Sequence, residues 1–338
     1  MTDIDFVISW VNFSDPEWQH EYKKHKPEFI PEHISGAYKD FDILRYWFRG
    51  IEQNALWVRK IHFITDCQVP DWLNQKHPKI NIVNHKQIFP DESMLPTFNS
   101  GAIEMNLDNI PDLSEKFVYF NDDMFLIKPV EPERFFQNNL PKDFFNLHIL
   151  FHNGQFSHSI HEQMILINKE WEGIKWNDKN TYTKFFSWKY GIKENLLNFF
   201  LVQFKFLSLF KMYHHPQPFL KRTFREVKEA FPDEVDATCR RNFKHCENIY
   251  QYIFRYWALI KWDFIPYNPE DAYYCGFSTL SELIFGLKYI KNNWKIRIVC
   301  FNDSYKFEIS DVPHAKKELH QFFESIMPNA SEFEKKYQ

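Results

Sequence analysis

Short apolar runs alternate with segments of helical periodicity along the first third of the chain. The runs are rich in β-branched and aromatic side chains and predict strands at residues 4–11, 59–66, 80–84 and 116–121. Residues 42–55 place apolar side chains at helical spacing, and a further helix is expected near residues 100–110. Strands that alternate with helices predict an α/β fold with a mostly parallel, Rossmann-like sheet.

The pattern changes after about residue 140, where helical periodicity dominates. Residues 160–213 are expected to be mainly helical, a late strand is predicted at 294–301, and a closing helix at 314–327. We therefore expect an α/β core and a largely helical region that completes the active site. The core would comprise residues 1–140 with 290–338, and the helical region residues 141–289.

One segment of the helical region, residues 196–213, is very apolar but contains Asn198, Gln203, Lys205 and Lys211. A helix that spans a membrane needs about 20 residues with few charges, so we do not expect this segment to span one. A buried helix is the preferred interpretation. A helix that lies on a membrane surface is the alternative.

Composition and charge restrict the class of protein. The chain has 338 residues, and 41 basic against 45 acidic side chains give a net charge of -4, which argues against a nucleic-acid partner. The first residues lack the features of a secretory signal, and the five cysteines form no CxxC pair. These features predict a cytoplasmic protein with reduced thiols.

Two adjacent acids, Asp122 and Asp123, follow the predicted strand 116–121 and its last residue, Asn121. Ligands bind at the carboxyl ends of strands in open α/β sheets, and paired acids there are costly to bury without a partner. A divalent cation such as Mg²⁺ would satisfy them, and Asp303 at the end of the late strand could join. The alternative is an ordinary turn.

Four further segments contain candidates for chemistry. Trp10 and Asn12 lie in the loop after the first strand, which often contacts a nucleotide but could be a simple capped turn. Arg45 and Arg49 could bind a diphosphate or lie on a solvated helix face. The remaining two candidates are Glu104, which could equally be a surface residue, and His214, which could be a general base or belong to an ordinary loop.

Taken together, these segments resemble the Stealth family of sugar-1-phosphate transferases, whose bacterial members build capsule or cell-surface polysaccharides. The similarity extends over four blocks of sequence. They are Ile4–Trp18, Asp42–Asp123, His214–His245 and Cys300–Phe333, with motifs such as Trp10-Val-Asn-Phe-Ser-Asp-Pro16 and Asn121-Asp-Asp123. Phe13 stands where the family usually has glycine.

The resemblance implies a GT-A-like core, a UDP-sugar donor and Mg²⁺ or Mn²⁺. It implies transfer of sugar-1-phosphate to a hydroxyl of a glycan or lipid-linked glycan, with release of UMP. Glu104, Asp123 and His214 match family positions that activity needs. Lys244 stands where the animal relative has an arginine, and Arg241 could take that role instead.

These inferences combine into one mechanism. Asp122, Asp123 and Asp303 would hold the cation, His214 would be the general base, and Arg45 or Lys244 would offset the charge of the leaving UMP. The alternative enzyme is a metal-dependent glycosyltransferase that releases UDP. A third reading is a carbohydrate-binding protein of a polysaccharide machine, without turnover.

Overall fold

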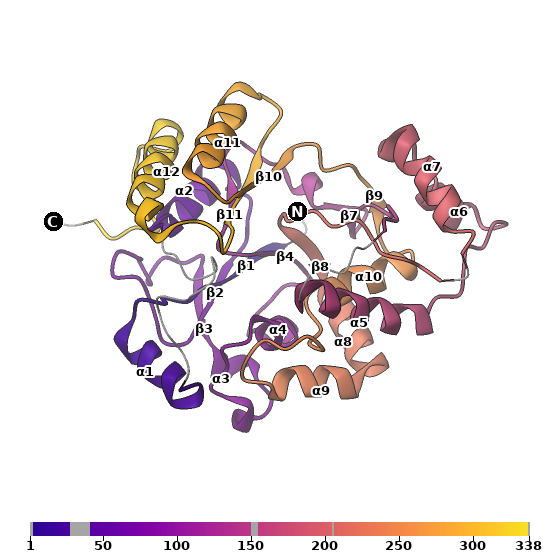
Figure 1. Ribbon diagram of the computed structural model, residues 1–338, viewed down its shortest axis with the longest axis horizontal. Helices are drawn as coiled ribbons and strands as arrows, with labels where there is room; N and C mark the ends of the chain where they lie inside the picture. Colours follow the sequence, from indigo (N-terminus) through magenta and orange to yellow (C-terminus); the bar gives the residue numbers. More distant parts are fainter. Residues whose placement is uncertain (1–2, 28–40, 150–154, 205, 337–338) are drawn as a thin grey trace.

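The main sheet of the protein is mostly parallel (Figure 1). The computed structural model describes residues 3–27, 41–149, 155–204 and 206–336. The strand order is β3-β2-β1-β4-β8, in which β8 alone runs antiparallel to its neighbour. The strands are β1 (Ile4–Ser9), β2 (Ile61–Thr65), β3 (Ile80–Asn84), β4 (Lys116–Phe120) and β8 (Gln217–Leu220). The prediction of an α/β fold with a mostly parallel sheet is confirmed.

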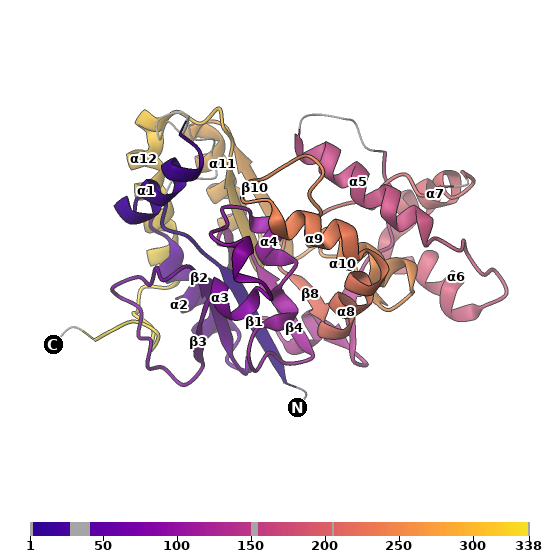
Figure 2. The same cartoon turned by 90° about the horizontal axis from the view of Figure 1, so that it is seen from below.

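Alternate residues of the central strands enter two separate hydrophobic cores. Phe6 of β1 and Phe120 of β4 belong to one core, whereas Val7 and Tyr119 belong to the other. This follows from the two-residue period of a strand, which directs successive side chains to opposite faces. Figures 1 and 2 show helices on both sides of the sheet. The first core includes side chains of α2 (Leu44–Asn54), α11 (Leu280–Asn292) and α12 (Val312–Ile326).

The second core is covered by helices that come mainly from the middle of the chain. They are α4 (Ser100–Glu104), α5 (Gln155–Lys169), α8 (Lys221–Ala230), α9 (Pro232–Arg240) and α10 (Tyr252–Ile260). The short α3 (His85–Ile88) follows β3, and α1 (Pro16–His25) follows β1. The predicted helix at 100–110 is shorter than expected, because α4 ends at Glu104.

A second sheet lies beside the main one and has the order β10-β11-β5. Its strands are β5 (Met124–Leu126), β10 (Ala272–Phe277) and β11 (Ile298–Asp303). Gly50 lets α2 lie directly against this sheet, since a Cβ there would come within 2.6 Å of the Leu126 carbonyl oxygen. Because β5 starts one residue after Asp123, the Asp122–Asp123 turn connects the two sheets.

The middle region also contributes strands, so the two parts of the chain interlock. Its strand β8 forms an edge of the main sheet, and β10 pairs in parallel with β11. A small third sheet contains β6 (Phe136–Gln137), β7 (Leu140–Asp143) and β9 (Ile265–Pro266). The division into two regions stays a prediction.

The structure corrects the expectation of a buried helix over residues 196–213. Helix α7 (Gly191–Leu201) follows α6 (Lys179–Phe185) and ends well before residue 213. Only Asn198 and Leu201 of α7 are buried. In Figure 1, α6 and α7 stand at one end of the molecule. None of the helices in the described ranges is long and apolar enough to cross a membrane.

Candidate active site

A pocket of about 370 Å³ opens where the strands of the main sheet end. It is lined by residues that follow β1 and β4 and by the last residues of β11, together with side chains from α4 and from the chain before β8. Nine of the predicted site residues line it: Trp10, Asn12, Glu104, Asn121, Asp122, Asp123, His214, Lys244 and Asp303. Side chains as far apart in sequence as Trp10 and Asp303 therefore share one cavity, as expected for the carboxyl edge of such a sheet.

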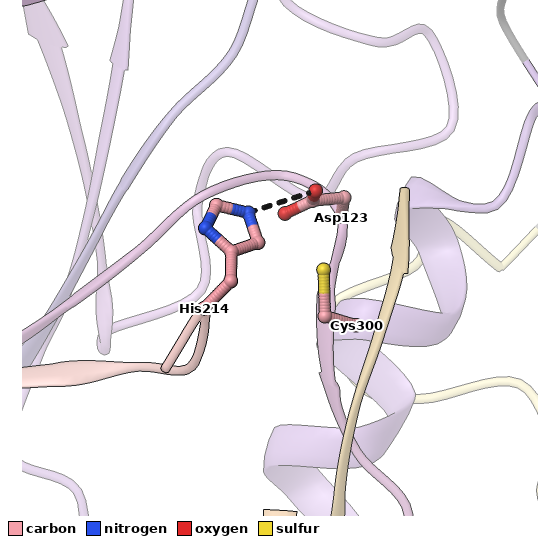
Figure 3. A group of neighbouring side chains, drawn as sticks. All are labelled: Asp123, His214 and Cys300. Carbon is pink, nitrogen blue, oxygen red and sulfur yellow. Dashed lines mark hydrogen bonds and ion pairs between the residues drawn. The ribbon is translucent and has the colours of Figure 1, made fainter. Parts of the chain in front are cut away.

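Asp123 is the centre of the hydrogen bonds in this pocket. Its Oδ2 accepts a hydrogen bond from Asn302 Nδ2 at 2.9 Å and contacts His214 Nε2 at 3.1 Å (Figure 3). Its backbone carbonyl accepts from the Phe301 amide at 2.9 Å, which ties the turn to β11. Burial raises the pKa of the Asp123 carboxyl, but hydrogen bonds from His214 and Asn302 and the charge of His214 outweigh burial and lower it. Asp123 is therefore held ionised.

His214 is poised as a proton acceptor with a defined orientation. Because an ionised carboxylate only accepts hydrogen bonds, Nε2 carries the proton shared with Asp123, and Nδ1 is the nitrogen that can receive another. Burial acts to lower the pKa of His214, but the hydrogen bond and charge of Asp123 outweigh it and raise that pKa. The pair thus resembles the carboxylate–histidine arrangement of general-base catalysis.

Glu104 is a buried carboxyl that a short helix presents to the pocket. Asn99 caps α4 by accepting a hydrogen bond from the Gly101 amide, which fixes the start of that helix. The Gln251 amide donates to Glu104 Oε2 at 2.8 Å. Burial raises the pKa of Glu104 to about 7, against the lowering effects of this hydrogen bond and of Lys244. A carboxyl that titrates near neutrality in a pocket is typical of a functional group.

The loop after β1 is fixed by a glutamine from the loop after β2. Gln68 accepts from the Asn12 amide at 2.8 Å and donates to the Asn12 carbonyl at 3.1 Å. Asp15 accepts from the Glu17 amide and caps α1. The loop therefore contains the helix cap that the sequence suggested, while Trp10 and Asn12 line the pocket.

The structure adds two residues to the site that the sequence did not single out. Asn302 donates to Asp123 and accepts from the Tyr274 hydroxyl at 3.1 Å. Cys300 is buried, and its ligand atom lies within 4.8 Å of those of Asp123 and His214 (Figure 3). Their signal in the sequence was proximity to Asp303, which follows Asn302 by one residue and Cys300 by three.

The chemistry of the site fits a hard divalent cation at Asp123. Its second oxygen, Oδ1, is buried and has no hydrogen-bond partner among the residues that the structure describes, which is costly for an ionised carboxylate. Asp122, Asp303 and Asn121 line the same pocket and offer further oxygens, the ligands that Mg²⁺ prefers. Burial raises the pKa of the Cys300 thiol well above its usual range, so this side chain suits such an ion poorly. The close group of Asp123, His214 and Cys300 is thus a different donor set from the three predicted carboxylates.

Two predicted binding residues lie elsewhere. Arg45 and Arg49 are described in the structure but do not line the pocket. The Arg45 guanidinium lies over the Trp72 ring at 5.5 Å. Arg49 is buried and donates through Nε to Glu334 at 2.7 Å, which fastens α2 to the C-terminal segment.

Of the two basic candidates Lys244 and Arg241, the lysine is the one that lies in the pocket. Lys244 lines the pocket, whereas Arg241 donates to Glu247 at 2.6 Å and to Asn248 at 3.2 Å outside it.

Replacing Arg49 by methionine is expected to destabilise the fold without changing the pocket. The buried Glu334 would lose its charged partner and, within the described part of the chain, keep only its hydrogen bonds from Ser331, which lowers the free energy of unfolding by about 3–5 kcal/mol. Turnover and donor KM of the folded fraction should stay unchanged. Urea denaturation and steady-state kinetics test this, with the double variant Arg49→Met, Glu334→Met as the matched control that restores most of the stability. A raised donor KM in the folded single variant would instead indicate that Arg49 contacts the donor.

Comparison with known proteins agrees with this site. Residues 37–144 match the family model described as Stealth protein CR2, conserved region 2, and residues 290–338 match Stealth protein CR4, conserved region 4. A capsular polysaccharide phosphotransferase WcwK of Streptococcus pneumoniae is 37% identical, over 99% of both chains. The chain belongs to the Stealth family.

Other full-length relatives carry similar names. The exopolysaccharide phosphotransferase cps2G of Lactiplantibacillus plantarum is 32% identical over 98% of this chain and 96% of its own. The receptor polysaccharide phosphotransferase WefC of Streptococcus oralis is 31% identical over 99% of this chain and all of its own. The predictions of Stealth membership and of a phosphotransferase are confirmed. Conserved region 2 contains Glu104 and the Asp122–Asp123 pair, and conserved region 4 contains Cys300, Asn302 and Asp303.

Proposed function

We propose that this Stealth protein transfers a hexose- or N-acetylhexosamine-1-phosphate from a UDP-sugar to a hydroxyl of a glycan or lipid-linked glycan. The product is a phosphodiester, UMP is released, and the reaction belongs to the synthesis of a capsule or other cell-surface polysaccharide at the cytoplasmic face of the membrane. The relatives' names support the polysaccharide context. The observation that carries the reaction type is the Asp123–His214 pair inside a pocket that also contains Asp122, Asp303 and Lys244.

In this proposal His214 is the general base. Nδ1 takes the proton of the acceptor hydroxyl, whose oxygen attacks the β-phosphorus of the donor. The bond between that phosphorus and the oxygen that bridges it to the α-phosphorus breaks, and UMP leaves with the electron pair. Asp123 keeps the imidazole oriented and stabilises its positive charge after proton transfer.

A divalent cation would be held by Asp123 Oδ1 together with Asp122 and Asp303, and would neutralise charge on the donor diphosphate. Lys244 reaches the same pocket and would offset the charge of the departing UMP. Glu104 positions the sugar and, when ionised, adds to the negative field that raises the pKa of His214. Most of the catalytic effect is then positioning and charge neutralisation, as in phosphoryl transfer generally.

Nucleotide release distinguishes this reaction from its alternative. The protein would be incubated with a panel of UDP-sugars and a bacterial surface-glycan extract, with Mg²⁺ or Mn²⁺ and with EDTA. We expect UMP and a phosphodiester product, both lost with EDTA and in His214→Ala. UDP with a glycoside would instead identify a metal-dependent glycosyltransferase. If the protein bound glycans but released neither UMP nor UDP, even with the acceptors of the named relatives, it would be a carbohydrate-binding protein and not a transferase.

A further inference from the structure

Helix α7 and the segments that flank it expose a dense group of large apolar side chains. We call this group the α7 patch, defined as Trp188, Ile192, Leu196, Phe199, Phe200 and Phe204. Trp188 is 85% exposed, Ile192 81% and Phe204 68%. Contiguous exposed apolar surface of this kind normally marks a site of interaction.

The patch is held outward by specific contacts on the opposite face of the helix. Asn198 is fully buried, accepts from the Leu147 amide at 2.7 Å and donates to the Phe145 carbonyl at 2.6 Å. Ile192, Leu196 and Phe199 follow each other at spacings of four and three, so they share one helix face. Because the face that contains Asn198 is anchored against the rest of the protein, the opposite, apolar face points away from the core.

The charge around the patch indicates what covers it. Residues 175–211 contain seven lysines and two acidic residues, whereas the whole chain carries a net charge of -4. Of these lysines, Lys175, Lys179 and Lys193 are exposed, while Lys184 is buried and Lys211 pairs with Glu194. Lys193 is exposed on α7 itself. Two copies of this chain would bring two such positive segments together, and interface cores are depleted in lysine. An anionic surface instead complements the charge.

We propose that the α7 patch docks on the surface of an anionic lipid bilayer. A helix with Trp, Phe and Leu on one face and lysines beside it is the composition of segments that lie in a membrane interface. The aromatic side chains would enter the boundary between headgroups and acyl chains, and Lys193 would face the headgroups. In Figure 2, α5 and α7 lie in the upper part of the view, as does α1, which follows the end of β1 near the pocket, although α1 and α7 are at opposite ends of the long axis. A docked molecule would thus present its pocket toward acceptors at that surface.

Sedimentation with vesicles tests the proposal on the full chain. We expect binding to vesicles of equal parts phosphatidylglycerol and phosphatidylcholine, weaker binding at high salt, and little binding to phosphatidylcholine alone. The double variant Ile192→Asp, Phe200→Asp should lose at least about tenfold in affinity. The matched control is Phe285→Asp, because Phe285 is 70% exposed on α11 and lies outside the patch; it should bind as the unchanged protein does.

A second measurement locates the contact. Lipids with brominated acyl chains should quench tryptophan fluorescence of the unchanged protein, and Trp188→Phe should remove most of that quenching while Trp294→Phe does not. Absence of vesicle binding, or equal loss in the Phe285 control, would overturn the proposal. The proposal would also be overturned if light scattering showed a dimer of the unchanged protein and a monomer of the double variant. Circular dichroism and UMP release with a water-soluble acceptor should be unchanged in all variants, which separates this test from that of the proposed reaction.

Discussion

Replacing Asp123 by asparagine is expected to lower turnover by roughly 10³–10⁴-fold while the fold remains intact. The amide keeps the size of the side chain but removes the charge that stabilises the His214 imidazolium. It also removes Oδ1 as an ionised ligand for a cation. Because both functions meet on one carboxylate, the loss should be large, as it should be for His214→Ala. The measurement is UMP release at saturating donor and cation.

Asn302 provides the matched comparison for Asp123. Asn302→Ala removes one of the hydrogen bonds to Asp123 Oδ2 but leaves the charge in place. Its activity should fall only about tenfold, the cost expected for one net hydrogen bond to a charged group. In EDTA, proton NMR should show a lower His214 pKa in Asp123→Asn than in the unchanged protein. Activity of Asp123→Asn within tenfold of normal would show that the Asp123–His214 pair is not the catalytic unit.

The strands and their polar ends could be predicted because their signals are local. An apolar run followed by Asp122 and Asp123 is visible in ten residues, and the parallel sheet then brings such ends together. The role of Asn302 depends on the pairing of β11 with β5, which are more than 170 residues apart. The hydrophobic periodicity of either segment does not indicate that these two strands pair.

Two differences between expectation and structure have similar causes. Arg49 occupies a helical position where a charged side chain normally faces solvent, but its partner Glu334 lies 285 residues away and covers it. The apolar run at 196–213 has the composition of a buried helix, and whether α7 is buried depends on what packs over it. Pattern fixes which face of a helix is apolar, whereas only tertiary contacts decide whether that face meets the core.

The second large effect is expected at Glu104, where loss of activity should accompany a gain in stability. The pKa of Glu104 is about 7 in the folded protein against an ordinary value of 4.5. Between these values the folded state binds more protons than the unfolded chain, so stability falls as pH rises. At pH 8 the buried charge costs about 3 kcal/mol, since each pKa unit corresponds to about 1.4 kcal/mol. Glu104→Gln should remove this cost while its carbonyl still accepts from the Gln251 amide.

Urea denaturation in EDTA at several pH values measures the gain. Glu104→Gln should be more stable than the unchanged protein at pH 8, by up to about 3 kcal/mol, and the difference should vanish below pH 4.5. Glu92→Gln, at an exposed position, controls for the loss of one negative charge. UMP release by Glu104→Gln should fall at least about 10²-fold. If Glu104→Gln is both less stable at pH 8 and inactive, Glu104 is a structural residue. If it is more stable but has lost turnover, the carboxyl lowers stability and is present because the reaction requires it.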